Sequence, residues 1–380
     1  MKNKCRSGDN QWADLHQSSL QQDDSCCLTL GAADGCGGLG GRTRLSHGKG
    51  EQALASETSV RAIYRDRLRQ ARDLIAAGNH AEARRALDAL KADEVVAANR
   101  LLGETTVLGL PRQLHSAYLK LAKAEKNLVE RIGLQHSLVP DPALLERFTA
   151  FGIDEIREMT RLSREAVPRV IHQIWLGSLA VPGSTKRWAV HAARTGFEYR
   201  LWRESDLEAL GVSRHPAYLR MLEEGDYPGA VDVARYFVLH ALGGVYIDCD
   251  WYPTRDDLGL ADLLPLVGLM ALPEETPRET GKGSLLLTNS LIAAPLAHPV
   301  FARLLQVLPE VMAALPEAPA WWSTGPLIMT VVFRSTNVSV PDAGLVAANL
   351  RRGAPFSEVE AACAAAVAQG HGLLVGWKSW

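Results

Sequence analysis

The hydrophobic pattern of the first half of the chain is helical. Between about residues 59 and 134, apolar side chains such as Leu68 and Ala71 recur at three- and four-residue steps, which predicts amphipathic helices. Gly78 and Asn79 predict a tight turn between two of them. The resulting hairpin resembles one tetratricopeptide unit, and no second copy follows at the expected spacing. These helices are expected either to bind a partner or to cap the next domain.

The pattern changes after Pro168, where short apolar runs replace the helical spacing. Strands are predicted in VPRVIHQIWLG, EYRLWRESD and VYIDCDWY, and a helix ended by glycine in AVDVARYFVLHALGG. Strands alternating with helices are typical of an α/β domain with a mainly parallel sheet. We therefore predict a tail at residues 1–57, a helical region at 58–165 and an α/β domain at 166–380.

The predicted tail is rich in Gly, Ser, Asp and Gln and has little apolar periodicity, so we expect it to be disordered. Gly35, Gly37 and Gly40 match GxGxxG, but no helix pattern follows, and a flexible glycine-rich segment is the expectation. The tail holds four of the six cysteines, at spacings that fit no zinc site, and reduced thiols are expected. These four are Cys5, Cys26, Cys27 and Cys36.

Composition narrows the class of protein without identifying it. Hydrophobic residues make up 47% and charged residues 22%, as in an ordinary globular protein. A formal net charge of −2 gives no reason to expect a nucleic-acid partner. No apolar segment is long enough to cross a bilayer, and the N-terminus lacks a secretory signal. We expect a cytoplasmic protein, and an effector secreted by another route would have the same features.

Two acidic residues, Asp248 and Asp250, follow the apolar residues GGVYI in the stretch GGVYIDCDWYP. In a strand, residues i and i+2 point to one side, so Asp248 and Asp250 can face one ligand while Cys249 points away. Carboxylates suit Mg²⁺ or Mn²⁺, which complete their shells with phosphate oxygens and water. A D-x-D phosphatase is an alternative, but Tyr252, followed by Pro253, stands where that class expects Thr or Val.

Five blocks together carry a resemblance to a known family. YPGAVDVARYFVLHALGGVYIDCDWYP resembles the core of the DXD-containing sugar-binding region of Och1-like mannosyltransferases and bacterial GT32-type glycosyltransferases, and distantly that of large clostridial toxin glucosyltransferases. VPRVIHQIWLG, LLTNSLIAAPLAHPVF, WWSTGPLIMT and GWKSW resemble further segments in the same order. The resemblance covers roughly Val167 to Trp380 and implies a GT-A nucleotide-sugar-binding domain.

The resemblance also implies donor-binding roles for five side chains. Trp175 would stack on the nucleobase, and Asp232 would hold ribose or sugar hydroxyls. Arg235 would lie near the donor, Tyr246 would line the same side of the strand, and Asn289 would lie close to the sugar. The residues alone leave plainer alternatives open: core packing for both aromatic residues, a solvated surface salt bridge for the Asp–Arg pair, and a satisfied buried amide for Asn289.

The metal site implied by the resemblance includes the end of the sequence. Asp248 would contact donor hydroxyls and Asp250 would ligate the ion. Ser379 would reach the metal, and Trp380 would cover the phosphates of the donor. The toxins place a Glu three residues before this serine; it is absent here, and His371 resembles a histidine of the Och1-like enzymes that would replace it.

The resemblance therefore implies a metal-dependent, retaining glycosyltransferase with Mn²⁺ or Mg²⁺ and a UDP- or GDP-sugar donor. The acceptor would be a protein, a peptide or a glycan, and the serine- and cysteine-containing tail is one hypothetical acceptor. Ser323, Thr324 and Gly325 would form either an acceptor-side loop or an ordinary turn. The alternative to an enzyme is a helical scaffold with a degenerate transferase domain.

Overall fold

The computed structural model describes residues 47–380, apart from 99, 107, 139, 141, 275–285, 317 and 342. The chain divides into two compact units, Met1–Thr58 and Ser59–Trp380. Of the first unit only the part from His47 is described, as the beginning of helix α1. This helix starts inside the expected tail because EQALA consists of strong helix formers. The glycine motif and the four N-terminal cysteines lie outside the described residues.

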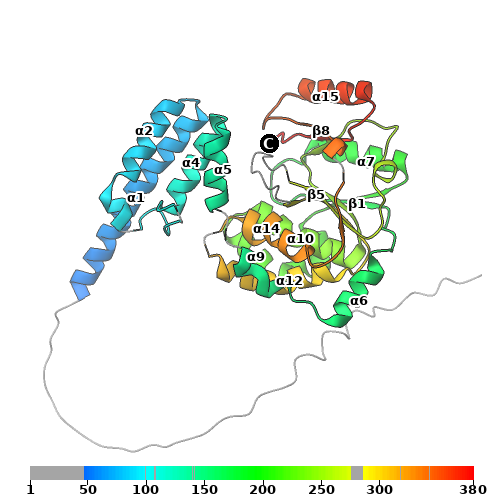
Figure 1. Ribbon diagram of the computed structural model, residues 1–380, viewed down its shortest axis with the longest axis horizontal. Coiled ribbons are helices and arrows are strands. Elements are labelled where there is room, and N and C mark those ends of the chain that lie inside the picture. Colours follow the sequence, from blue (N-terminus) through cyan, green and yellow to red (C-terminus); the bar gives the residue numbers. More distant parts are fainter. Residues whose placement is uncertain are drawn as a thin grey trace, which may run out of the picture. The chain divides into compact units, whose positions relative to one another are not determined.

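The first part of the second unit is helical, as the apolar spacing predicts (Figure 1). A turn at Gly78, whose φ is +80°, connects α1 to α2. Ala83, Leu87 and Leu90 form the buried stripe of α2. The helices of this region are α1 (His47–Ala76), α2 (His80–Lys91), α3 (Glu94–Ala98), α4 (Arg112–Ala124), α5 (Leu128–Leu138), the 3₁₀ helix η1 (Pro142–Thr149) and α6 (Ile153–Leu162).

A six-stranded mixed sheet follows, in the order β2-β1-β3-β6-β5-β7. Its strands are β1 (Val170–Ile174), β2 (Glu198–Trp202), β3 (Gly244–Ile247), β5 (Leu269–Pro273), β6 (Leu287–Ala294) and β7 (Val338–Ser339). β6 pairs antiparallel with both β3 and β5, whereas the β1–β2, β1–β3 and β5–β7 pairs are parallel. The prediction of an α/β domain with a mainly parallel sheet is confirmed, with β6 as the reversed strand.

Two hydrophobic clusters cover the two faces of this sheet. Along β3 the side chains alternate: Val245 and Ile247 belong to one cluster and Tyr246 to the other. Figure 1 shows α10, α12 and α14 below the sheet and α7 above it. The helices are α7 (Gly183–Thr195), α8 (Glu204–Ala209), η2 (Val212–Arg214), α9 (Pro216–Glu223), α10 (Tyr227–Leu242), α11 (Leu260–Leu263), α12 (Pro299–Ala314), α13 (Ala320–Ser323) and α14 (Pro326–Phe333).

Two glycines allow α10 to turn directly into β3. Gly243 and Gly244 have φ values of +63° and +94°, which favour glycine. A Cβ at Gly244 would lie 2.8 Å from the ring Nε2 of His172 and from the carbonyl oxygen of Val170. The Gly-Gly pair therefore sets the close approach of β3 to β1, and with it the position of the aspartates that follow β3.

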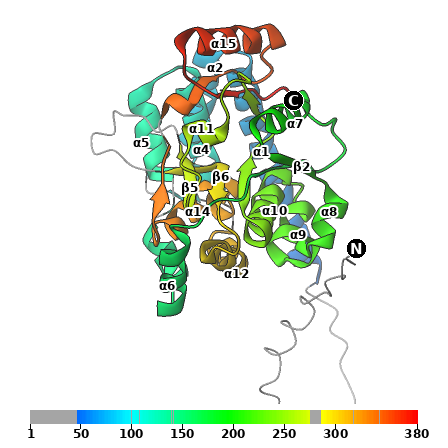
Figure 2. The ribbon, with the colours of Figure 1, turned by 90° about the vertical axis from the view of Figure 1, so that its right-hand side faces the viewer.

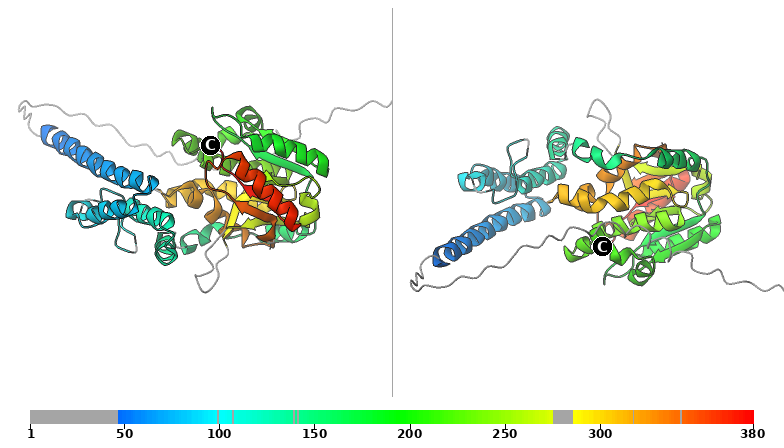
Figure 3. Two further views of the ribbon diagram at one scale, coloured as in Figure 1. Left: turned by 90° about the horizontal axis from the view of Figure 1, so that it is seen from above. Right: turned by 90° about the horizontal axis from the view of Figure 1, so that it is seen from below.

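A small second sheet brings the last residues of the sequence to the end of β3. It consists of β4 (Trp251–Pro253), β9 (Leu374–Gly376) and β8 (Val346–Asn349), in the order β4-β9-β8. The 3₁₀ helix η4 (Ala343–Leu345) precedes β8. α15 (Phe356–Gln369) packs on β8 and β9 and covers this sheet (Figures 2 and 3). Since β4 directly follows the aspartates, its pairing with β9 places residues 377–380 beside them.

Candidate active site

The two aspartates lie where buried strand β3 ends. The backbone N–H of Asp248 donates to the Ser290 carbonyl at 2.8 Å, and the Gln173 side chain donates to the Asp248 carbonyl at 3.1 Å. Both aspartates are partly exposed, whereas Cys249 between them is buried with its thiol 3.4 Å from the Ile174 carbonyl. The alternation expected for an extended segment therefore leaves the two carboxylates available to a ligand.

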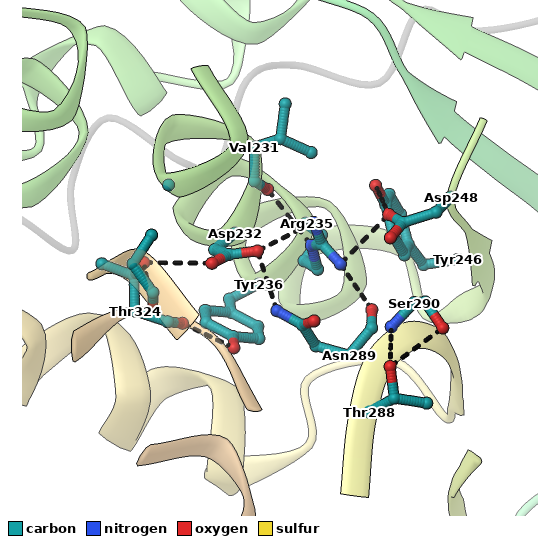
Figure 4. A network of polar contacts seen from close by, with 12 residues as sticks. Val231, Asp232, Arg235, Tyr236, Tyr246, Asp248, Thr288, Asn289, Ser290 and Thr324 are labelled. Carbon is teal, nitrogen blue, oxygen red and sulfur yellow. Dashed lines mark hydrogen bonds and ion pairs between the residues drawn. The ribbon is translucent and has the colours of Figure 1, made fainter. Parts of the chain in front are cut away.

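Arg235 connects the aspartates to helix α10 (Figure 4). Its guanidinium lies 3.2 Å from Asp248 Oδ1 and 2.9 Å from Asp232 Oδ1, and it donates to the Asn289 carbonyl at 2.5 Å. It also stacks over the Tyr246 ring, 4.5 Å from the centroid. Burial alone would lower the pKa of Arg235, but the charge of Asp248 and the other acidic neighbours raises it. Arg235 is therefore a fixed positive charge.

Asp232 lies one helical turn before Arg235 and is held from three directions. Its Oδ1 accepts from the Asn289 amide at 2.8 Å, and its Oδ2 accepts from the Thr324 hydroxyl at 3.0 Å. Burial raises the pKa of this carboxyl to about 7; Arg235 opposes the shift and the negative charge of Asp248 adds to it. Asp232 is 6% exposed and Arg235 3%, so the alternative of a solvated surface salt bridge is wrong.

Helix α10 presents these side chains because of its local sequence. The Asp226 side chain caps the helix by accepting from the Gly229 N–H at 2.9 Å, and the backbone ends at the Gly243 turn. The (i, i+3) spacing places Asp232 and Arg235 on the face that packs against β6. The helix is buried along most of its length, which explains how two charged residues became part of the core.

Tyr246 completes the network around Asp248. Its hydroxyl donates to Asp248 Oδ1 at 2.8 Å, and burial raises the pKa of this tyrosine well above its usual value. Arg235 and Tyr246 thus both bind Oδ1 of Asp248. In the described residues no other side chain forms a hydrogen bond or ion pair with this carboxylate, so its second oxygen is free to coordinate a ligand.

Asp250 lies beside the end of the sequence. The Trp377 N–H donates to its carbonyl at 2.6 Å. Burial raises the pKa of the Asp250 carboxyl to about 6, the negative charge of Asp248 adds to this, and Lys378 opposes it. The two neighbouring carboxylates repel each other, and a divalent cation bound to both would relieve this repulsion. Within the described ranges no cluster of three or more His, Cys, Asp or Glu side chains could hold a metal ion. The pair therefore fits an ion that also takes oxygens from a substrate.

Trp175 and Trp380 meet next to this rim. Their ring centroids are 4.8 Å apart and the rings are nearly perpendicular, at 84°. The Trp175 indole N–H donates to the Leu179 carbonyl at 2.9 Å, and the residue is 8% exposed. Ser379, the neighbour of Trp380, is exposed. The contact between the tryptophans places residues 377–380 between Asp250 and Trp175.

His371 is not brought to the aspartates. β4 and β9 pair Trp251 with Gly376 and Pro253 with Leu374, so residues before Leu374 lie beyond the far end of β4. The Thr254 hydroxyl accordingly donates to the Gly372 carbonyl at 2.8 Å. His371 is exposed at that end, and this register gives it no access to an ion at Asp250.

The Ser323-Thr324-Gly325 segment does not form an exposed acceptor loop. Ser323 is 1% exposed and Thr324 is fully buried, with its carbonyl accepting from the Tyr236 hydroxyl at 2.8 Å. A Cβ at Gly325 would lie 2.9 Å from Asp232 Oδ2, so glycine allows the segment to approach the carboxylate. Thr324 thus holds Asp232 in position through its hydroxyl. The Thr-Gly pair in the sequence drew attention to Thr324, but it did not show that Asp232 is the hydrogen-bond partner.

Comparison with known proteins matches the segment that contains this network. Residues 182–262 match the family model described as a glycosyltransferase sugar-binding region containing a DXD motif. The chain contains a glycosyltransferase sugar-binding region. Asp232, Arg235, Asp248 and Asp250 all lie within it.

Relatives of the chain include proteins named as fungal and viral glycosyltransferases. Inositol phosphoceramide mannosyltransferase 3 of Schizosaccharomyces pombe is 26% identical over 47% of this chain and 48% of its own. A mannosyl phosphorylinositol ceramide synthase of Saccharomyces cerevisiae is 27% identical over 45% and 43%. An uncharacterized glycosyltransferase of Acanthamoeba polyphaga mimivirus is 30% identical over 24% and 39%. The chain spans about half the length of the curated fungal relatives it matches or less.

One solved structure is similar over half of the chain. It is described as PaToxG glycosyltransferase, and the match covers 50% of this chain and 77% of that one, at 17% identity and a TM-score of 0.37.

In the part of the chain that the structure describes, no helix is both long and apolar enough to cross a membrane.

Proposed function

We propose that the protein transfers a hexose from a nucleoside diphosphate sugar to an acceptor, in a metal-dependent reaction that retains the anomeric configuration. The observation that carries the proposal is the network of Asp232, Arg235 and Asp248 beside Asp250, inside the matched DXD region. The names of the fungal relatives favour mannose as the sugar. Retention is what the resemblance to Och1-like and toxin enzymes implies.

Asp250, Asp248 and Ser379 would hold Mn²⁺ or Mg²⁺ together with the diphosphate of the donor. The ion, when bound, supplies Lewis-acid stabilisation of the charge that collects on the leaving diphosphate. Both acidic residues are already positioned by contacts within the protein. Arg235 and Tyr246 bind the Asp248 carboxylate, and the Trp377 N–H donates to the backbone carbonyl of Asp250.

The remaining side chains would bind and orient the donor. Asp232, fixed by Asn289 and Thr324, has the acceptor oxygens that ribose or sugar hydroxyls require. Trp175 would stack on the nucleobase. Trp380 would cover the phosphates and exclude water, since it already contacts Trp175 at one edge.

The domain organisation belongs to the same proposal. We assign the transfer chemistry to residues 166–380 and acceptor or partner recognition to the helical region at 58–165. The acceptor would carry a hydroxyl group, on a protein, a peptide, a glycan or a glycolipid; the last class enters because the fungal relatives are named for ceramide lipids.

A panel of nucleotide sugars tests the proposal. The protein is incubated with GDP-mannose, UDP-glucose, UDP-N-acetylglucosamine and UDP-galactose, with Mn²⁺, with Mg²⁺ and with chelator, and nucleotide release is measured. We expect metal-dependent release from one donor class, with GDP-mannose the first candidate. Release of phosphate from simple phosphomonoesters, with none from any sugar nucleotide, would favour a phosphatase. No turnover and no metal-dependent nucleotide binding would favour a scaffold.

A further inference from the structure

Lys378 lies beside the carboxylate pair and has none of the roles assigned above. Its preceding residue, Trp377, donates its backbone N–H to the Asp250 carbonyl at 2.6 Å. This backbone contact places Lys378 next to the segment that carries the two aspartates.

The backbone of Lys378 is held in place by the turn at residues 350–354. The Gly353 N–H donates to the Lys378 carbonyl at 2.9 Å, and the Trp377 indole N–H donates to the Ala354 carbonyl at 2.9 Å. Arg352 Nε donates to the Trp380 carbonyl at 3.0 Å. These contacts fix where the lysine stem begins, and its ammonium lies on the side of the rim that Trp380 borders.

The ammonium itself forms no salt bridge in the part of the chain that the structure describes. Its Nζ lies 5.6 Å from the centroid of the Trp380 ring, and within the described residues Lys378 makes no salt bridge. The residue is partly exposed. A cation that lies over an aromatic ring at the edge of an acidic site, and that forms no salt bridge with the described residues, is available to an anionic ligand.

The charge of the site explains why such a cation is needed. With every carboxyl ionised, Asp232, Asp248, Asp250 and Arg235 carry a formal charge of −2, from three negative groups and one positive. One divalent ion neutralises this sum and leaves none to balance a diphosphate. Arg235 is already bound to two carboxylates and a carbonyl. Lys378, which forms no salt bridge within the described residues, adds a positive charge at this rim.

We propose that the Lys378 ammonium binds the phosphates of the nucleoside diphosphate. It would contact them from the side of Trp380, whereas the metal would contact them from the side of the aspartates. This inference rests on the proposed function and extends it to a residue outside the DXD region. A lysine suits the task because its compact charge on a flexible stem follows phosphate oxygens whose positions differ between ligands.

Calorimetric titration of GDP and UDP in the presence of Mn²⁺ tests the role of Lys378. K378Q removes the charge and keeps most of the length, and K378R keeps the charge. We expect K378Q to bind the preferred nucleoside diphosphate at least about tenfold more weakly, K378R to recover most of the affinity, and the loss to shrink as salt rises. Binding of the corresponding nucleoside without phosphate should be equal in all three proteins.

Mn²⁺ alone gives a second readout that a purely structural lysine would not produce. Removing a positive charge beside Asp250 should leave Mn²⁺ binding in K378Q as tight as in the wild type or tighter, while the diphosphate binds more weakly. K120Q, at an exposed lysine of α4 that contributes nothing to the site, is the matched control and should bind as the wild type does. Thermal unfolding of each variant verifies that it is folded.

The outcomes separate this inference from the proposed function. If the wild type binds no nucleoside diphosphate with Mn²⁺, both are overturned. If the wild type binds one and K378Q binds it equally well, only the role of Lys378 is overturned. If K378Q loses affinity for the diphosphate, the nucleoside and Mn²⁺ together, the lysine supports the local structure and the inference is again wrong.

Discussion

Replacing Asp232 with Asn removes a buried charge while keeping the shape of the side chain. The Asn Oδ1 can still accept from Asn289 and Arg235, which contact Asp232 Oδ1. The new amide group faces the Thr324 hydroxyl, which can accept because it already lies 3.2 Å from the Ala320 carbonyl to which it can donate. D232N should therefore fold, with no buried polar group left without a partner.

The free energy at stake follows from the shift in the Asp232 pKa. Burial raises this pKa from 3.8 to about 7 in the folded protein. A difference of about 3 units corresponds to roughly 4 kcal/mol, at 1.36 kcal/mol per unit. Because the folded-state pKa is the higher one, the stabilising contribution is fully present below about pH 4. It is lost as pH rises to about 7, above which Asp232 is ionised in both the folded and the unfolded protein. D232N has no carboxyl at this position, so its stability does not fall in this way.

Urea unfolding of the wild type and D232N at pH 4.5 and pH 8 measures the difference. Eight of the nine tryptophans lie between Trp175 and Trp380, so their fluorescence reports on the α/β part. Titrating groups distant from Asp232 affect both proteins alike, so subtracting the two pH dependences isolates Asp232 together with its coupling to Asp248. We expect the wild type to lose about 3 to 4 kcal/mol more than D232N between these pH values. Equal pH dependence in the two proteins would refute the account of a buried, charge-strained carboxyl.

Four further substitutions test individual contacts. D250A should abolish metal-dependent nucleotide release while circular dichroism stays unchanged; normal turnover would contradict the metal assignment. W380A should weaken binding of nucleoside diphosphate by about two- to tenfold, measured by calorimetry, because it removes the ring that would cover the phosphates. T324V should lower the free energy of unfolding by about 1 to 3 kcal/mol, since Asp232 Oδ2 loses its donor, and an unchanged urea midpoint would argue against that bond. H371A should retain wild-type turnover with the preferred donor, because the residue is exposed at the far end of β4; a large loss would mean that residues 371–380 rearrange on binding.

The strand and helix pattern was readable from the sequence because it is local. The apolar runs around β1, β2 and β3 and the glycine that ends α10 predicted these elements. The reversed direction of β6 was not predictable, since side-chain alternation is the same in parallel and antiparallel strands. The start of α1 at His47 does not follow from the Gly- and Ser-rich composition of the predicted tail, because the helix propensity of residues 51–55 outweighs it locally.

The site shows the same division between local and long-range information. The D-x-D spacing of Asp248 and Asp250 is weak evidence alone, and it was informative because an apolar strand, preceded by a helix and Gly-Gly, comes before it. By contrast, Asp232 and Arg235 look like a surface pair in the sequence, and their burial depends on β6 and on Thr324, which is 92 positions away from Asp232. The position of His371 was decided by strand pairing across the chain, as the Thr254–Gly372 contact shows over 118 positions. No periodicity or composition carries such information.

The central claim is that Asp248 and Asp250 hold a divalent ion together with the diphosphate of a nucleotide sugar. A crystal structure of the protein grown with Mn²⁺ and GDP-mannose or a UDP-sugar, measured at the manganese absorption edge, tests it most directly. The account predicts one anomalous peak within coordination distance of Asp250, with the donor phosphates on its open side and Lys378 beside them. A bound donor with no ion between it and the two carboxylates would contradict the claim.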